Sequence, residues 1–210
     1  DPWFASGHLH DITVVSPVFM GEKLIALFAC TCHQLDIGGL GQGPDGKSVY
    51  EEGLYIPILK LVKEGELNQD LLKIIQGNVR TPYEVQGDIL SYVAANETSG
   101  VKLVDMVHEY GLEDLAYIGN EIIERSHAGM LEEIRKLPKG TTYNTITLDG
   151  YDKPVEIVCA LTITDDAIEV DFSGSSEAST KGINLVLNYT QAYANYGIRC
   201  VVGAHIPNNT

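Results

Sequence analysis

The feature that most constrains the fold is a change of hydrophobic period along the chain. Residues 11–32 and 141–172 contain runs and alternations of β-branched and apolar residues, which are typical of strands. Residues 67–138 instead carry apolar residues at spacings of three and four, which are typical of helices. This order predicts a mixed α+β fold, with an N-terminal β-hairpin and Gly-rich loop, a central long helical hairpin, and C-terminal strands and a helix.

The first third predicts strands around an irregular loop. Two strand-like runs, residues 11–19 and 23–32, flank a short turn that contains glycine, which favours a β-hairpin. Residues 37–53 hold six glycines, too many for long regular structure, and a loop of this length in a compact domain is commonly functional. Residues 54–62 are expected to form another strand, with Pro57 at an edge or a bulge.

The middle of the chain predicts helices. Residues 67–75 fit a short helix, and Thr81 followed by Pro82 resembles a helix start. The periodic pattern after it predicts one long helix or two abutting ones, ending at Gly111. A second helix is expected to follow and to stop at Pro138, so that the two would form a helical hairpin.

The last third returns to strands. Three strands are expected at residues 141–148, 155–164 and 167–172, and a final amphipathic helix is expected at residues 185–202. The chain is thus expected to comprise a β-rich region, a helical region, and a region of strands plus a helix, with bounds 1–65, 66–138 and 139–210. Because it starts without Met and ends directly after a turn-like segment, it is expected to be a fragment of a larger subunit.

The charge of the chain excludes several classes of partner, and its cysteines indicate a compartment. The chain has 14 Lys and Arg against 29 Asp and Glu, a net charge of −15, and its basic residues form no cluster. Binding to nucleic acid or to an anionic membrane surface is therefore not expected. The four cysteines lie in apolar contexts without the spacing of a disulfide framework, and no secretion signal is visible, so we predict a cytoplasmic protein.

Three residues at the outer ends of the predicted hairpin suggest a metal site. His8 and Asp11 lie three positions apart before the first strand, and His33 ends the second strand. A hairpin brings its outer ends together, so these side chains are expected to converge. Two imidazoles and one carboxylate, with further coordination positions open, suit a catalytic Zn²⁺, Mn²⁺ or Fe²⁺ ion.

Other assignments of these residues stay open from spacing alone. A histidine near a strand end is more often an ordinary surface or core residue than a ligand. His10, adjacent to Asp11, could replace His8 as a ligand or be only a polar neighbour. Asp36, three positions after His33, is placed to orient a ligand imidazole through its second nitrogen.

Further polar and sulfur-bearing residues give weaker signals. Arg80 and Asp88 could pair with groups in an active site, but a structural ion pair is the commoner arrangement. Cys30 and Cys32 are expected on one face of a strand, where packing in the core is favoured over a place beside His33.

Several ungapped segments, in the same order, resemble the hydantoinase B/oxoprolinase family. They are GHLHDITVV at 7–15, HQLDIGG at 33–39, YEEGL at 50–54, NVRTP at 78–82, GD at 87–88 and VDFSG at 170–174. The resemblance implies that His8, Asp11 and His33 are the family's metal ligands. The usual family pattern at the first segment is His-Leu-Pro-Asp, and this chain has His10 where proline is common.

The resemblance also implies a function and a partner. Members of this family, of the N-methylhydantoinase, 5-oxoprolinase and acetone or acetophenone carboxylase types, work with an ATP-binding subunit of the hydantoinase A type. We therefore expect the metal-bearing subunit of a hetero-oligomeric, ATP-dependent enzyme that hydrolyses a cyclic amide, with His10 and Asp36 as catalytic residues. A ketone carboxylase subunit and a non-catalytic scaffold are the alternatives. This chain has no GxxxxGK[ST] loop, which agrees with ATP being bound by the partner.

Overall fold

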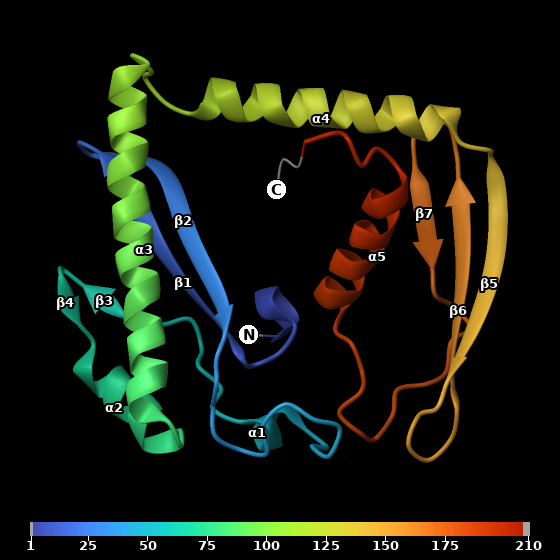
Figure 1. Ribbon diagram of the computed structural model, residues 1–210, viewed down its shortest axis with the longest axis horizontal. Helices are drawn as coiled ribbons and strands as arrows, with labels where there is room; N and C mark the ends of the chain where they lie inside the picture. The colour runs from blue at the N-terminus through green and yellow to red at the C-terminus, as the bar shows by residue number, and fades with distance from the viewer. Residues whose placement is uncertain (1, 208–210) are drawn as a thin grey trace. The chain divides into compact units, whose positions relative to one another are not determined.

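The chain has a mixed α+β fold, as predicted. The structure, a computed structural model, describes residues 2–207 and divides the chain into two compact units (Figure 1). The first unit comprises Asp1–Leu115 with Thr180–Tyr189, and the second comprises Ala116–Ser179 with Thr190–Thr210. One division between the units falls between Leu115 and Ala116, inside the predicted helical region 66–138.

The N-terminal hairpin of the first unit is confirmed. After a π-helical turn at Pro2–Ser6, strands β1 (Asp11–Met20) and β2 (Lys23–His33) pair antiparallel in a two-stranded sheet. Gly21 adopts φ +61°, a conformation that favours glycine and lets the chain reverse within two residues. The register places Asp11 directly opposite His33, so both side chains point to the same face of the hairpin.

The opposite face of the hairpin packs against a long helix. Helix α3 (Pro82–Glu109) contacts both strands and helix α2 (Gln69–Asn78). Pro82 stands in its first turn, as predicted, because the N–H that proline lacks has no partner at a helix start. The buried core beneath the hairpin consists of residues from the two helices: Leu71, Ile75, Val85, Ile89 and Tyr92.

Two positions of α3, the polar Asn96 and the small Gly100, let the helix approach the hairpin closely. The Asn96 side chain donates a hydrogen bond to the Val14 carbonyl at 3.0 Å. One turn further, Gly100 lies so close to Val18 that an added Cβ would stand 3.1 Å from its Cγ2 atom. Helix α3 thus holds β1 by hydrogen bonding and by close packing at successive turns.

The segment after the glycine-rich loop differs from its prediction. The loop contains one helical turn, α1 (Val49–Glu52), and residues 54–61 are irregular, so the predicted strand over 54–62 is wrong. Only β3 (Val62–Lys63) and β4 (Glu66–Leu67) pair there. Pro57 has no N–H to donate to a ladder, and Leu54, Ile56 and Leu61 pack partly buried against the core, whereas Ile58 is 86% exposed.

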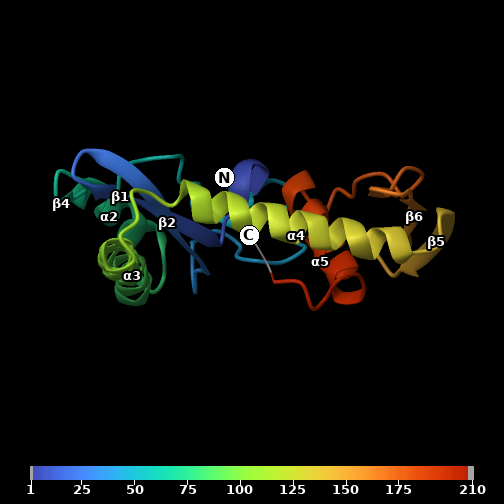
Figure 2. The same cartoon turned by 90° about the horizontal axis from the view of Figure 1, so that it is seen from above.

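The second unit confirms the remaining elements to within about two residues. Helix α4 (Ala116–Lys136) is a single unbroken helix, which Figure 2 shows along its length. It is followed by the antiparallel sheet of β5 (Gly140–Leu148), β6 (Val155–Ile163) and β7 (Ile168–Asp171), in that order. Helix α5 (Leu187–Val201) begins at the end of the first unit and continues in the second.

Both helices of the predicted helical hairpin are present. Helix α3 belongs to the first unit and packs on the β-hairpin and α2, whereas α4 belongs to the second unit. Sequence periodicity identifies an apolar helix face but not the surface that covers it, so the packing of α3 on the β-hairpin could not be predicted from it.

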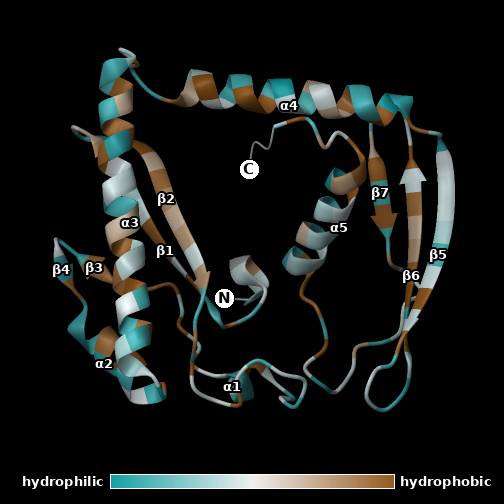
Figure 3. Cartoon of the chain, in the orientation of Figure 1, coloured by the Kyte–Doolittle hydropathy of each residue, from teal (hydrophilic) through white to brown (hydrophobic). Residues whose placement is uncertain are grey.

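Polar and apolar residues alternate along both long helices (Figure 3). Within residues 2–207, no helix combines the length and the apolar composition needed to cross a membrane.

Candidate metal centre

The three predicted ligands converge at the open end of the β-hairpin. His33 Nδ1 lies 3.3 Å from Asp11 Oδ1, and His8 Nε2 lies 3.7 Å from Asp11 Oδ2. The rings of His8 and His33 stand edge to face with centroids 5.1 Å apart. One donor atom from each of the three residues lies within 4.8 Å of the other two.

This donor set fits a divalent transition metal. Metal–ligand bonds of about 2.0–2.2 Å place neighbouring donor atoms about 3 to 4 Å apart, so His8, Asp11 and His33 could enclose one ion with small side-chain movements. Imidazole nitrogen and carboxylate oxygen together suit Zn²⁺, Mn²⁺ and Fe²⁺. The His33 side chain is 48% exposed, which leaves one side of the cluster open to solvent. The role of the three residues as ligands stays a prediction.

His10 lies beside the cluster as a buried neighbour. Its ring stacks on that of His33, with centroids 5.0 Å apart and an interplanar angle of 9°, and the residue is only 5% exposed. Burial lowers the pKa of His10, and the nearby His33 and His8 lower it further. Among the described residues, His8 and not His10 belongs to the cluster with metal-binding geometry, so geometry favours His8 as the ligand.

Asp36 has a different set of partners from the one expected. Its carboxylate accepts hydrogen bonds from Gly38 N at 2.9 Å, from the Arg80 guanidinium at 2.7 Å and from Arg80 N. None of its described hydrogen bonds comes from an imidazole. Arg80 therefore forms an ion pair with Asp36, which connects the segment after His33 to the start of α3.

The Asp36 ion pair predicts an acid-sensitive contribution to stability. Burial alone would raise the pKa of Asp36, but hydrogen bonds from Arg80 and Gly38 and the Arg80 charge together lower it. A carboxyl whose pKa is lower in the folded than in the unfolded state stabilises the fold above its unfolded pKa, and this stabilisation is lost as pH falls through the folded pKa. The Tm gap between wild type and Asp36→Asn should therefore narrow from pH 6 to pH 3.

Thermal unfolding at a series of pH values checks this expectation. Asp70→Asn is the matched control, because the Asp70 side chain is 91% exposed and its Tm gap should stay small throughout. A gap for Asp36→Asn that is constant between pH 6 and pH 3 would contradict the assignment.

Glu52, which the sequence reasoning did not single out, has a perturbed carboxyl near His8. Burial raises the pKa of its carboxyl, and the neighbouring charge of His8 opposes this shift, which puts Glu52 in the surroundings of His8. The Nδ1 atom of His8 is buried without a hydrogen-bond partner in the described structure. Glu52 stands in the YEEGL segment, but nothing in its spacing marked it, because its position depends on how the glycine-rich loop folds back.

The loop fold that places Glu52 depends on glycine. Gly39 adopts φ +56°, and a Cβ there would lie 2.6 Å from the backbone of residues 51–53. Leu40 N and Gly41 N donate hydrogen bonds to the carbonyls of Glu51 and Glu52. Only glycine permits this approach of the loop to the end of α1.

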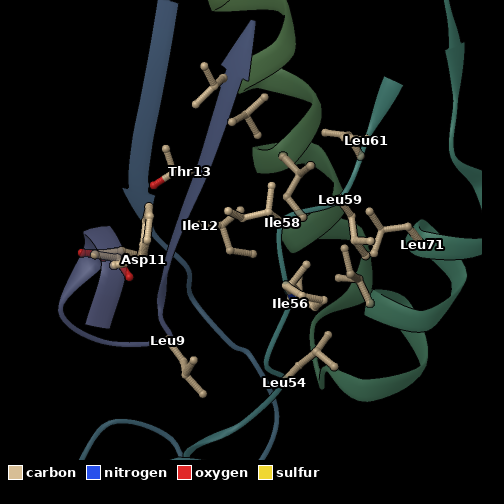
Figure 4. A pocket seen from close by; sticks show the side chains of 17 residues that line it. Leu9, Asp11, Ile12, Thr13, Leu54, Ile56, Ile58, Leu59, Leu61 and Leu71 are labelled. Atoms are coloured by element: carbon tan, nitrogen blue, oxygen red, sulfur yellow. The ribbon is translucent and has the colours of Figure 1, made fainter. Parts of the chain in front are cut away.

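A largely apolar cavity of about 390 Å³ lies beside β1. It is lined by consecutive residues of β1 from Asp11 to Val15 and by the irregular segment that follows the glycine-rich loop. Figure 4 shows Asp11 at the margin of the cavity, apart from the leucine and isoleucine side chains that form most of its wall. Asp11 is thus shared between the candidate metal cluster and the edge of this cavity.

The fold and the site together describe a mixed α+β protein with a two-histidine, one-carboxylate cluster on a β-hairpin. The family profile described as hydantoinase B/oxoprolinase matches residues 1–210. The chain belongs to the hydantoinase B/oxoprolinase family.

Curated relatives and solved structures agree with this assignment. The chain is 30% identical to an uncharacterized protein of Methanocaldococcus jannaschii, over 100% of this chain and 38% of the relative. It is 29% identical to the putative B subunit of a D-/L-hydantoinase of Pseudomonas sp., over 93% of this chain and 35% of the relative.

Among solved structures, the ATP-dependent caprolactamase from Pseudomonas jessenii superposes with a TM-score of 0.88 at 25% identity, covering 95% of this chain and 35% of that one. A nucleotide-free acetone carboxylase shares the fold, with a TM-score of 0.80 at 20% identity, covering 95% of this chain and 29% of that one. The chain therefore spans less than two fifths of the length of these relatives.

Proposed function

We propose that this chain forms the metal-binding part of a subunit that hydrolyses a cyclic amide, such as a hydantoin, 5-oxoproline or a lactam. The observation that carries the proposal is the convergence of His8, Asp11 and His33 at the open end of the hairpin. The likeness to a caprolactamase and to a putative hydantoinase subunit supports a cyclic amide as the substrate.

The proposed enzyme is hetero-oligomeric and ATP-dependent. A hydantoinase A-type partner subunit would bind ATP and phosphorylate the substrate, and the subunit that contains this chain would complete the hydrolysis. The names of two relatives as subunits of larger enzymes support a partner. We retain the cytoplasm as the predicted location.

Each residue of the centre has a proposed part in this chemistry. A divalent ion held by His8, Asp11 and His33 would supply Lewis-acid activation of a substrate oxygen or of water. Burial, with His33 and His8 nearby, lowers the pKa of His10, and a neutral imidazole beside His33 would not repel a cation. The exposed side of His33 gives substrate a path to the cluster.

Substrate turnover in the complex with the partner subunit tests the proposal. The complex is supplied with ATP and, in separate reactions, with 5-oxoproline, hydantoin, caprolactam, or acetone and bicarbonate. We expect ring opening of at least one cyclic amide, with no reaction when ATP is left out.

Consumption of the ketone that depends on bicarbonate, with no ring opening, would contradict the proposal and favour the carboxylase that shares this fold. A complex that turns over none of these substrates and binds no metal would favour a scaffold subunit.

A further inference from the structure

Gln34 is buried between the two segments that carry the proposed ligands. It follows His33 directly, and its backbone N–H donates to the His10 carbonyl at 2.8 Å, which joins the end of β2 to the segment before β1. The residue is only 1% exposed, and its Nε2 atom donates to the Tyr92 hydroxyl at 2.5 Å. One residue thus links the His33 segment, the His8–Asp11 segment and helix α3.

Tyr92 is a rigid anchor for this link. It is buried in the core cluster with Ile89 and Val85, one turn of α3 before Asn96. Burial raises the pKa of Tyr92 to about 12, against the opposing effect of the hydrogen bond from Gln34. The hydroxyl therefore stays protonated at neutral pH, and the hydrogen bond does not change with pH in that range.

Stability alone does not explain a glutamine at this position. The Oε1 atom of Gln34 is buried without a hydrogen-bond partner in the described structure. An unsatisfied buried polar group destabilises the fold, whereas apolar side chains in place of both hydrogen-bonded partners are often neutral or stabilising. The pair is therefore better explained by the geometry that it imposes than by the stability that it adds.

We propose that the hydrogen bond between Gln34 and Tyr92 positions His33 against His8 and Asp11, and so sets the affinity of the metal centre. Gln34 and Tyr92 are positioning residues and touch neither metal nor substrate. The inference rests on the proposed metal site. It adds that the buried core, through Tyr92 of α3, fixes the position of the end of β2 that carries His33.

The test compares metal affinity with stability in purified protein. Zn²⁺ and Mn²⁺ are titrated against a competing chelator, and Tm is measured for the same samples without metal. Mutation of residues that support the ligands of a metal site typically lowers metal affinity by about 10- to 100-fold. For Tyr92→Phe we expect the lower end of this range, a loss of about tenfold. The double variant Gln34→Leu/Tyr92→Phe should lose at least as much affinity while its Tm equals or exceeds that of wild type.

Asn96→Ala is the matched control, because Asn96 binds the same hairpin from the same helix but at Val14 and Ser16, away from the ligands. It should lower Tm and leave metal affinity within about twofold. Wild-type affinity in both Tyr92→Phe and the double variant would overturn the positioning role while leaving the metal site intact. A loss of affinity in Asn96→Ala equal to that in Tyr92→Phe would also overturn it, because any loosening of the hairpin would then be enough to weaken metal binding. A wild type that binds neither ion would remove the proposed metal site itself, and the inference with it.

Discussion

His33→Ala is expected to reduce cyclic-amide turnover more than about 100-fold in the complex with the partner subunit. Loss of a residue that only supports a ligand already costs about 10- to 100-fold, so loss of a ligand should cost more. His33 also has the most exposed side chain of the cluster, so its removal would take away a proposed donor atom at the side that is open to solvent. Steady-state rates with saturating ATP measure this effect.

His127→Ala is the matched control for this measurement. His127 is an exposed histidine on α4, outside the candidate centre, and its replacement should leave turnover unchanged. A rate for His33→Ala within a few fold of wild type would show that catalysis does not depend on this imidazole.

Ile89→Ala is expected to lower the free energy of unfolding by about 2–5 kcal/mol, the range found when a buried isoleucine or leucine is truncated to alanine. Ile89 is 2% exposed and lies in the core cluster where α2, α3 and the hairpin meet. Truncation there leaves a cavity that the surrounding helices and strands cannot fully close. Urea unfolding of the wild type and the variant gives the difference directly.

Ile74→Ala is the matched control for Ile89→Ala, because it truncates the same type of residue. Ile74 lies on α2 but is 54% exposed, so little apolar burial is lost and the change should stay below about 1 kcal/mol. Equal losses for the two isoleucines would mean that the buried cluster is not the core of this unit.

The hairpin and the convergence of Asp11 and His33 could be predicted because their signals are local. Period-two patterns on both sides of a glycine turn define a register, and this register places Asp11 opposite His33. The choice between His8 and His10 could not be made from sequence, because it depends on how the three residues before β1 turn. The structure brings His8 into the cluster and stacks His10 on His33.

The features that sequence reasoning missed all depend on contacts between distant segments. Asp36 was expected to hydrogen-bond to an imidazole, but its carboxylate accepts hydrogen bonds from Arg80, 44 positions away. Residues 54–61 have the composition of a strand but form none, and Leu54, Ile56 and Leu61 pack against the core instead, which alternation of side chains cannot reveal. Gln34 and Tyr92 were not singled out from the sequence, because they lie 58 positions apart and only the fold brings them together.

The central claim is that His8, Asp11 and His33 bind a divalent metal, and elemental analysis of the purified protein tests it most directly. We predict about one tightly bound transition-metal ion per chain in wild type and in His127→Ala, and loss of that ion in His33→Ala. Equally low metal content in wild type and His33→Ala, after exposure to Zn²⁺, Mn²⁺ and Fe²⁺, would contradict the account.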